Sequence, residues 1–427
     1  MSVAPGWEIH GNLISRYQLR DSTLDDRDQD LFTWLGLEGG SKHRDPVTVS
    51  LAGRSAWDLE GDGLGAFGNS LSTLEDTRGG RHDLRLYRAW AGFHDWIPGG
   101  EVRIGRQNLF QAPVLLRLDG AWLRAPAALA GLPGEFQGYA GRPNHYWEGS
   151  ARGDAAAGAS LDLSPWKGGQ TRLDFMHLRD RRFFGEASNN LVAGTVSQAG
   201  WDGSWWASLS GSFLDGSQRD LDLQGFWSDV DRGWQLQFFA HALRSRQSVN
   251  TLEFDPLTAV LLPEEPFYEA QLQASKRLAV APLGLGSAWR LEGGAYGRQL
   301  RDGARESEFN RSYQRFWLGA ALEDLPWKGA EVSVHGESWD SGTDEILSAS
   351  AELRVRFAEA WDVSLGTHYS LYQYDFFAQL ERDNVRSWTL RVKWQALEDL
   401  RLQTSLEILE DDIEDFQVFW IQGEVDF

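Results

Sequence analysis

The chain has 427 residues, including 21 Trp, 46 Gly and no Cys, and its formal net charge is -21 at pH 7. Without Cys there are no disulfides, no thiolate catalysis and no C-x-x-C-H haem attachment, and the acidic balance argues against nucleic acid, whose phosphates need a basic surface. No apolar run reaches the roughly 18 residues that a membrane-spanning helix needs. The start, MSVAPGW, has no apolar core of a signal peptide, and we expect that such a peptide has been removed.

Short runs in which apolar and polar residues alternate follow one another along the chain. In chain order, clear examples are VTVSLAGRSAW (47–57), WRLEGGAYGRQ (289–299), SASAELRVRF (348–357), SWTLRVKWQ (387–395) and RLQTSLEIL (401–409). A period of two residues predicts β-strands with one face buried and one face wet.

Two kinds of connection take turns between these runs. Short ones, such as 164–170 and 325–330, alternate with long or acidic ones, such as 20–30, 244–266 and 300–312. Counting the runs predicts about 22 strands, within a range of roughly 18 to 22.

The apolar series of these runs differs from the core of a soluble β-sandwich. It mixes Leu, Val and Phe with Gly and Ala, which fill a core poorly but are tolerated against lipid. Tryptophans near the ends of runs resemble the aromatic belt of a membrane protein; they are Trp7, Trp34, Trp57, Trp90, Trp122, Trp289, Trp361 and Trp388. Because only helices and closed barrels satisfy their backbone inside a bilayer, we predict an all-β, transmembrane, antiparallel up-and-down β-barrel. We expect residues 1–427 to form a single barrel domain with no N-terminal plug domain.

The closing stretch FQVFWIQGEVDF alternates strictly and ends on an aromatic residue. It resembles the C-terminal strand of bacterial outer-membrane barrels, which the barrel-assembly machinery reads. The resemblance is carried by Phe419, Ile421, Val425 and Phe427. We predict that this strand pairs with residues 7–19 and closes the barrel in the bacterial outer membrane.

A second stretch, VRIGRQNLFQAPVLLRLDGAWLRAP (102–126), is similar to part of the alginate-export and related porin-like barrels. The matching positions are Gly105, Arg106, Gln107, Asp119, Gly120 and Trp122. The resemblance implies transport across the outer membrane, through an arginine-lined lumen that passes an anionic polysaccharide in the exporters. The acidity of this chain fits that cargo poorly, so the cargo is not carried over.

A barrel of this size needs an obstruction. With strands about 4.8 Å apart and tilted by about 40°, 22 strands close at a diameter of roughly 40 Å and leave an opening of roughly 20 Å. We expect inward-folded loops (59–82 or 244–266) or a separate protein to fill it. The first hypothesis for function is a porin-like channel for diffusion or export of hydrophilic, charged solutes or a polysaccharide. The alternative is a sheath around a multihaem cytochrome, with the haem belonging to that partner.

Fixed charges on the inner wall are the best candidates for function, because rings of charge tune which solutes pass. We predict lumen-lining roles for Arg103, Arg117, Asp119, Arg290, Glu292, Arg298, Arg354, Arg356, Arg391 and Lys393. Many of these side chains are equally expected to pair across strands and stiffen the wall.

Other chemistry is less well supported by the sequence. The G-x-G-x-x-G at 63–68 lacks a strand–turn–helix context, and His241, His335 and His368 are expected to point inward from different strands. The acidic segments 21–30 and 410–415 lack the ordered spacing of a calcium loop, so we expect solvated loops or divalent bridges to surface lipopolysaccharide. We predict no catalytic residue, metal site or cofactor. Outer-membrane lipid, lipopolysaccharide and the assembly machinery are the expected partners, with a lumen-bound protein as a further option.

Overall fold

The computed structural model describes residues 7–23, 27–59, 81–110, 116–144, 153–182, 185–200, 202–245, 265–279, 286–304, 311–342, 345–375 and 380–427. These residues form one antiparallel sheet of 22 strands. Among them, no helix is long and apolar enough to cross a membrane.

The strands are β1 (Ile9–Ser22), β2 (Arg27–Gly39), β3 (Val47–Asp58), β4 (His82–His94), β5 (Glu101–Leu109), β6 (Leu116–Leu129), β7 (Leu132–Pro143), β8 (Ala155–Leu163), β9 (Gly169–Arg182), β10 (Gly185–Ala199), β11 (Trp205–Leu214), β12 (Ser217–Asp229), β13 (Trp234–Leu243), β14 (Phe267–Leu278), β15 (Ala288–Leu300), β16 (Tyr313–Glu323), β17 (Ala330–Asp340), β18 (Glu345–Phe357), β19 (Trp361–Asp375), β20 (Leu380–Gln395), β21 (Leu400–Glu410) and β22 (Asp415–Asp426).

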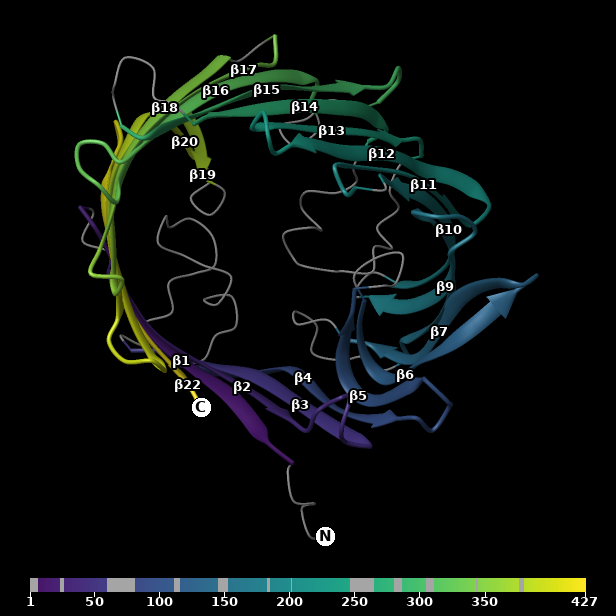
Figure 1. Ribbon diagram of the computed structural model, residues 1–427. Helices are drawn as coiled ribbons and strands as arrows, with labels where there is room; N and C mark the ends of the chain where they lie inside the picture. Colours follow the sequence, from purple (N-terminus) through teal and green to yellow (C-terminus); the bar gives the residue numbers. More distant parts are fainter. Residues whose placement is uncertain are drawn as a thin grey trace.

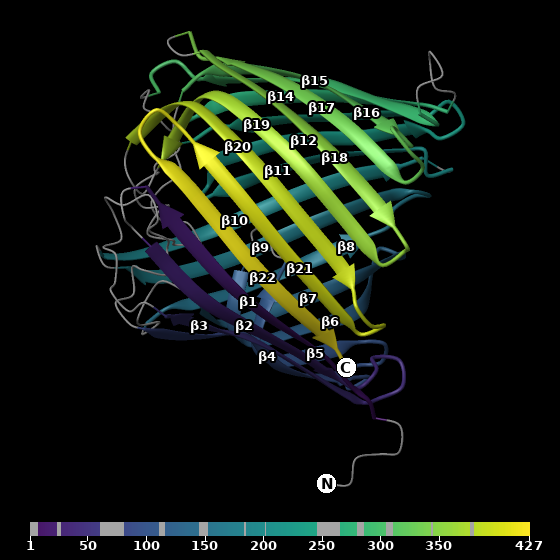
Figure 2. The ribbon, with the colours of Figure 1, turned by 90° about the vertical axis from the view of Figure 1, so that its left-hand side faces the viewer.

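The sheet closes on itself, because β1 pairs with β22 from Asn12 opposite Asp426 to Ser22 opposite Phe416. Figure 1 looks down the resulting ring, and Figure 2 shows the strands crossing its wall obliquely. The predicted fold, strand number and pairing of the closing strand are therefore confirmed.

The two rims of the barrel differ in their connections. β1 begins and β22 ends at one rim (Figure 2), where short turns such as 130–131 and 230–233 join neighbouring strands; we call it the turn-side rim. The opposite, loop-side rim carries the connection between β3 and β4 and the one between β13 and β14. Most of 59–82 and 244–266, which we expect to obstruct the lumen, lies outside the described residues, as does the motif at 63–68.

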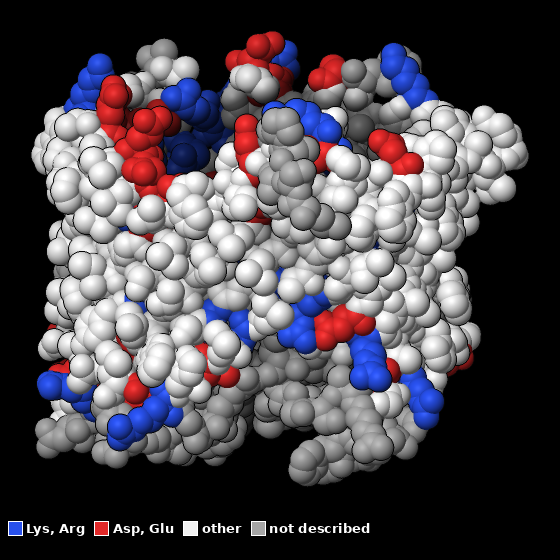
Figure 3. Space-filling model, turned by 90° about the horizontal axis from the view of Figure 1, so that it is seen from below, with Lys and Arg blue, Asp and Glu red and all other residues white. Residues whose placement is uncertain are grey.

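Alternation divides the wall into two series of side chains. The outer series exposes large apolar residues, for example Leu272 at 57%, Leu318 at 72% and Ile421 at 48%. The space-filling view in Figure 3 shows a broad uncharged band with charged side chains gathered towards its edges. The other series faces the lumen.

The sequence had led us to expect a polar lumen wall, but part of that wall is apolar. Along β5 to β11 it carries a cluster of buried apolar side chains that includes Leu118, Trp122 and Met176, which are 0%, 4% and 1% exposed. Leu191 and Leu214 extend the cluster on β10 and β11. A polar face therefore does not identify the lumen side of these strands.

Three tryptophans predicted for the outer belt also face the lumen. Trp34, Trp90 and Trp122 lie in the same series as the lumen arginines Arg16 and Arg103, over whose guanidinium groups they stack. Ring stacking on a cation gives these tryptophans an interior role that run-end position alone does not reveal.

Candidate functional site in the barrel lumen

Eight of the ten predicted lumen residues belong to the lumen series. The cross-strand register places Asp362 between Arg356 and Lys393, and Ser364 between Arg354 and Arg391, all on one face of the sheet. The eight are Arg103, Arg290, Glu292, Arg298, Arg354, Arg356, Arg391 and Lys393.

Arg117 and Asp119 belong to the outer series, which differs from our expectation. On β6 the lumen series is Leu118, Gly120 and Trp122, because Trp122 lies opposite the lumen residue Arg103. The expectation rested on the rule that polar residues face inward, and that rule fails where the lumen wall is apolar.

Several lumen charges are paired within the wall. Arg356 Nε donates to Asp362 at 3.3 Å, and Arg354 donates to the same carboxylate. Arg290 bonds to Glu331 at 3.3 Å, with both side chains partly exposed. These residues stiffen the wall, as the sequence allowed.

Three basic residues differ from these pairs. Within the described part of the chain, Arg391 and Lys393 make no ion pair, although both lie in the lumen series of β20. Arg298 stacks over the Phe267 ring at 3.7 Å, while its Nε and Nη2 have no hydrogen-bond acceptor. Arg391 and Lys393 are exposed and carry charge that a passing solute can meet, whereas Nε and Nη2 of Arg298 are buried.

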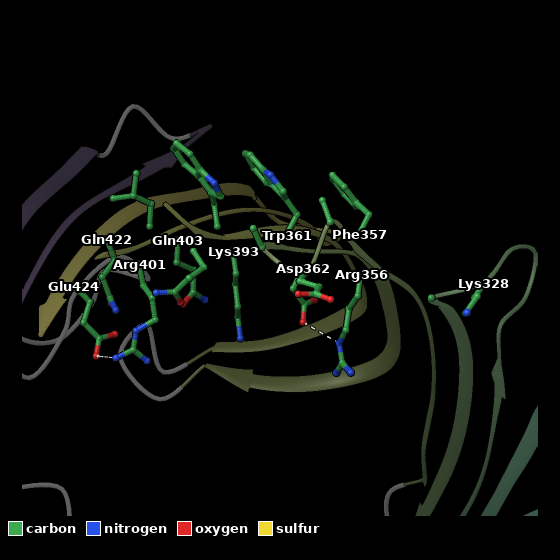
Figure 4. A pocket seen from close by; sticks show the side chains of 17 residues that line it. Lys328, Arg356, Phe357, Trp361, Asp362, Lys393, Arg401, Gln403, Gln422 and Glu424 are labelled. Atoms are coloured by element: carbon green, nitrogen blue, oxygen red, sulfur yellow. Dashed lines mark hydrogen bonds and ion pairs between the residues drawn. The ribbon is translucent and has the colours of Figure 1, made fainter. Parts of the chain in front are cut away.

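A pocket of about 930 Å³ lies on the lumen side of β18 to β22, towards the turn-side rim. Figure 4 shows Arg356, Asp362 and Lys393 pointing to one side of the sheet, while Phe357 and Trp361 point to the other. The pocket thus combines cationic side chains with the carboxylates of Glu359, Asp362 and Glu424.

The turn that brings Lys328 to this pocket is held by an aspartate outside the strands. The Ser287 hydroxyl and the Gly329 amide both donate to Asp324, which holds the pKa of that carboxyl below its usual range. Asp324 therefore stays ionised at neutral pH and keeps the turn in place.

Arginines clamped between two tryptophans are a lumen feature that sequence reasoning missed. Arg103 lies 4.6 Å from the ring of Trp90 and 4.7 Å from that of Trp122. Similar clamps hold Arg16, between Trp34 and Trp420, and Arg315, between Trp317 and Trp339. Each clamp joins two or three strands, so no local sequence signal announces it.

An uncharged polar sector occupies the lumen wall of β12 to β14. It contains the amide side chains Gln224, Gln235, Gln237, Gln271 and Gln273. Gln237 lies opposite Gln273, while Phe239 lies between Gln224 and Gln271. None of these amides makes a hydrogen bond with another described residue. These neutral amides offer hydrogen-bond donors and acceptors to solutes in the lumen.

The three candidate histidines lie in the lumen series as expected. His335 and His368 flank Ser350 in one cross-strand row, whereas His241 bonds to Asp222 at 2.6 Å on a distant part of the wall. Among the described residues no group of three or more His, Asp or Glu is arranged to hold a metal ion.

The acidic segment 21–30 is only partly a loop. Asp28 and Asp30 lie in β2, are 2% and 4% exposed, and form ion pairs with the buried Arg20 on β1. We expected the acidic residues of this segment to be solvated in a loop, but Asp28 and Asp30 are buried against Arg20.

Comparison with known proteins adds to the fold alone. No family model and no curated protein matches the chain. The similarity to the alginate-export barrels is therefore not confirmed.

Solved structures do match. The P pilus usher (PapC) translocation pore superposes with a TM-score of 0.52 at 9% identity, covering 98% of this chain and 99% of that one. Pseudomonas aeruginosa OpdQ gives 0.46 at 9% identity with 99% of both chains covered, and the outer membrane protein OpdK of the same organism gives 0.42 at 9% with 98% and 99% covered. At these identities the similarity concerns the closed barrel.

Proposed function

We propose that this chain is a bacterial outer-membrane channel through which hydrophilic, charged solutes pass by diffusion or export. The observation that carries the proposal is the opposite chemistry of the two faces of one closed sheet. A bilayer accepts a sheet only when it closes and turns an apolar face outward. The exposed Leu272, Leu318 and Ile421 supply such a face.

The lumen supports the solute class. Arg391 and Lys393 stand on the lumen wall without an ion pair among the described residues, next to the pocket of about 930 Å³. Fixed charges that no wall partner neutralises attract counter-charged solutes and repel others. The amide sector of β12 to β14 offers hydrogen bonds to the uncharged parts of the same solutes.

Planar-bilayer recording of the purified protein tests this function. We expect a steady ion current through the inserted protein, and outer-membrane fractionation should recover the native chain. A chain that stays soluble without detergent would contradict the membrane proposal.

The same recording separates the channel from the cytochrome sheath. The sheath predicts no open current and haem absorbance that co-purifies with the native protein. That combination would replace the channel by the conduit.

A further inference from the structure

A charged group interrupts the apolar outer face where β5, β6 and β7 approach the loop-side rim. Arg106 on β5, Asp119 on β6 and Arg142 on β7 lie side by side in register in the outer series. We call these three residues the β5–β7 charged row. Figure 3 shows acidic and basic side chains lying together towards one edge of the uncharged band on this side of the barrel.

The arginine and the aspartate of the row hold each other in place. Arg106 donates from Nε and Nη2 to the two oxygens of Asp119 at 2.7 and 2.6 Å, and from Nη1 to the carbonyl of Leu86 at 2.9 Å. A bidentate pair of this kind fixes the plane of the guanidinium group.

The second arginine has no such restraint. Arg142 lies directly opposite Asp119 on the other side, is exposed, and makes no ion pair with any residue that the structure describes. Arg117 stands in the same outer series, two residues before Asp119. Among the described residues of this outer series on β5 to β7, three arginines thus stand near the carboxylate of Asp119.

The row lies near the loop-side interface of the membrane, where a charged side chain costs little free energy and can reach lipid headgroups. Arg106 lies three residues before the end of β5, and Arg142 lies one residue before the end of β7. Three residues of a tilted strand correspond to roughly 8 Å along the membrane normal. An arginine costs about 2–4 kcal/mol at the bilayer midplane but at most about 1 kcal/mol near the interface, where lipid headgroups lie.

Large apolar side chains surround the row. Leu84 and Ile104, in the outer series of β4 and β5, expose 74% and 51% of their surface, and Phe110, directly after β5, exposes 76%. A ligand that fits this patch therefore has an anionic head for the arginines and hydrocarbon chains for the surrounding side chains.

We propose that the β5–β7 charged row binds a phosphate group of a lipid headgroup in the loop-side leaflet of the membrane. The planar guanidinium fork matches phosphate oxygens, and Arg142 is the group with free donors. Asp119 keeps Arg106 beside it in a fixed orientation. The inference rests on the proposed membrane location but not on what passes through the lumen.

Lipid binding to the full-length protein in detergent tests the site. Native mass spectrometry should show that diphosphoryl lipid A binds and that its dephosphorylated form binds about tenfold more weakly. Arg142→Gln should weaken binding of the phosphorylated lipid by a similar factor. The matched control is Arg386→Gln, because Arg386 is an exposed outer-series arginine on β20 that lies beside Tyr369 and Glu410 and not beside a second arginine in the register. This control should bind lipid like the parent protein.

The failing outcomes are distinct. Equal binding of both lipids, or unchanged binding by Arg142→Gln, would overturn the site. Arg142-dependent binding of inorganic phosphate as strong as that of the lipid would overturn the lipid assignment. Because Arg142 faces away from the lumen, Arg142→Gln should leave bilayer conductance unchanged. Absence of an ion current through the parent protein would count against the proposed channel and not against this lipid site.

Discussion

Gly11 and Phe427 join the first strand to the last residue of the chain. The Gly11 amide donates to the Phe427 carbonyl at 2.7 Å, and the Phe427 amide donates to the Gly11 carbonyl at 2.9 Å. A β-carbon on Gly11 would lie 2.6 Å from Cζ of the Phe427 ring and 2.7 Å from Leu37 Cδ2. The glycine lets the terminal ring cover the seam.

A bulkier residue at position 11 should loosen this seam. Gly11→Val would push the Phe427 ring aside, and because that ring is the end of a flexible, exposed side chain we expect a loss of about 1 kcal/mol in the free energy of unfolding. Urea unfolding followed by tryptophan fluorescence measures it. Gly297→Val is the control, because nothing lies within 4 Å of a β-carbon there. Equal stability of the two variants would show that the ring does not need the space.

A tighter contact joins Gly120 on β6 to Gly141 on β7. A β-carbon on Gly120 would lie 2.2 Å from the carbonyl oxygen of Ala140 and 2.6 Å from the Cα of Gly141. Since backbone cannot move aside as a side chain can, Gly120→Ala should cost about 2–3 kcal/mol. The same urea titration should show little change for Gly336→Ala, which meets open space. A Gly120→Ala barrel as stable as its parent would contradict this close approach.

Glu101 should contribute more to the free energy of unfolding than a carboxylate in an exposed ion pair does. It is 2% exposed, accepts from Arg103 Nε at 2.6 Å and lies 3.6 Å from Arg124. Glu101→Gln removes the carboxylate that Arg103 contacts and leaves Arg124 with Glu135 alone, and we expect a loss of about 2–4 kcal/mol. Arg290→Gln breaks an exposed pair with Glu331 and should cost less than about 1 kcal/mol. Similar midpoints in thermal or urea unfolding would refute the distinction.

Lys393 should influence ion selectivity. Removing this lumen charge in Lys393→Gln should shift the reversal potential in a KCl gradient towards that of potassium, because anions lose an attractive wall charge. Arg386→Gln removes the same charge from the outer face and should leave the potential unchanged. A reversal potential that moves equally in both variants, or in neither, would show that Lys393 does not act on permeating ions.

The sequence carried the architecture because a barrel repeats one simple pattern. Strand alternation and the regular change of connection type predicted the strand number, and the terminal Phe427 predicted the seam with β1. Each repeat added independent support, so local ambiguities did not change the closed fold.

Side-chain direction was harder to predict where both series of a strand are mixed. In β6, both charged residues of the run Arg117 to Leu123 lie in the outer series, and only pairing with β5 shows that Trp122 faces the lumen. The β3–β4 pair also contains a register shift between Ala52 and Gly53, which changes the alternation on one strand only. Contacts between distant strands, such as the clamp around Arg103, leave no local pattern.

The clamp around Arg16 forms only when β1 and β22 come together and close the ring. Its guanidinium lies over Trp34 on β2 and Trp420 on β22, and it bonds to Gln422 at 2.7 Å, across 406 positions of the chain. Joining such distant points in an open chain costs about 5 kcal/mol, against about 2 kcal/mol for a ten-residue loop. The clamp therefore completes late, after the intervening hairpins have brought the ends together. At that last step Trp420, one of 21 tryptophans in the chain, gains its contact with Arg16.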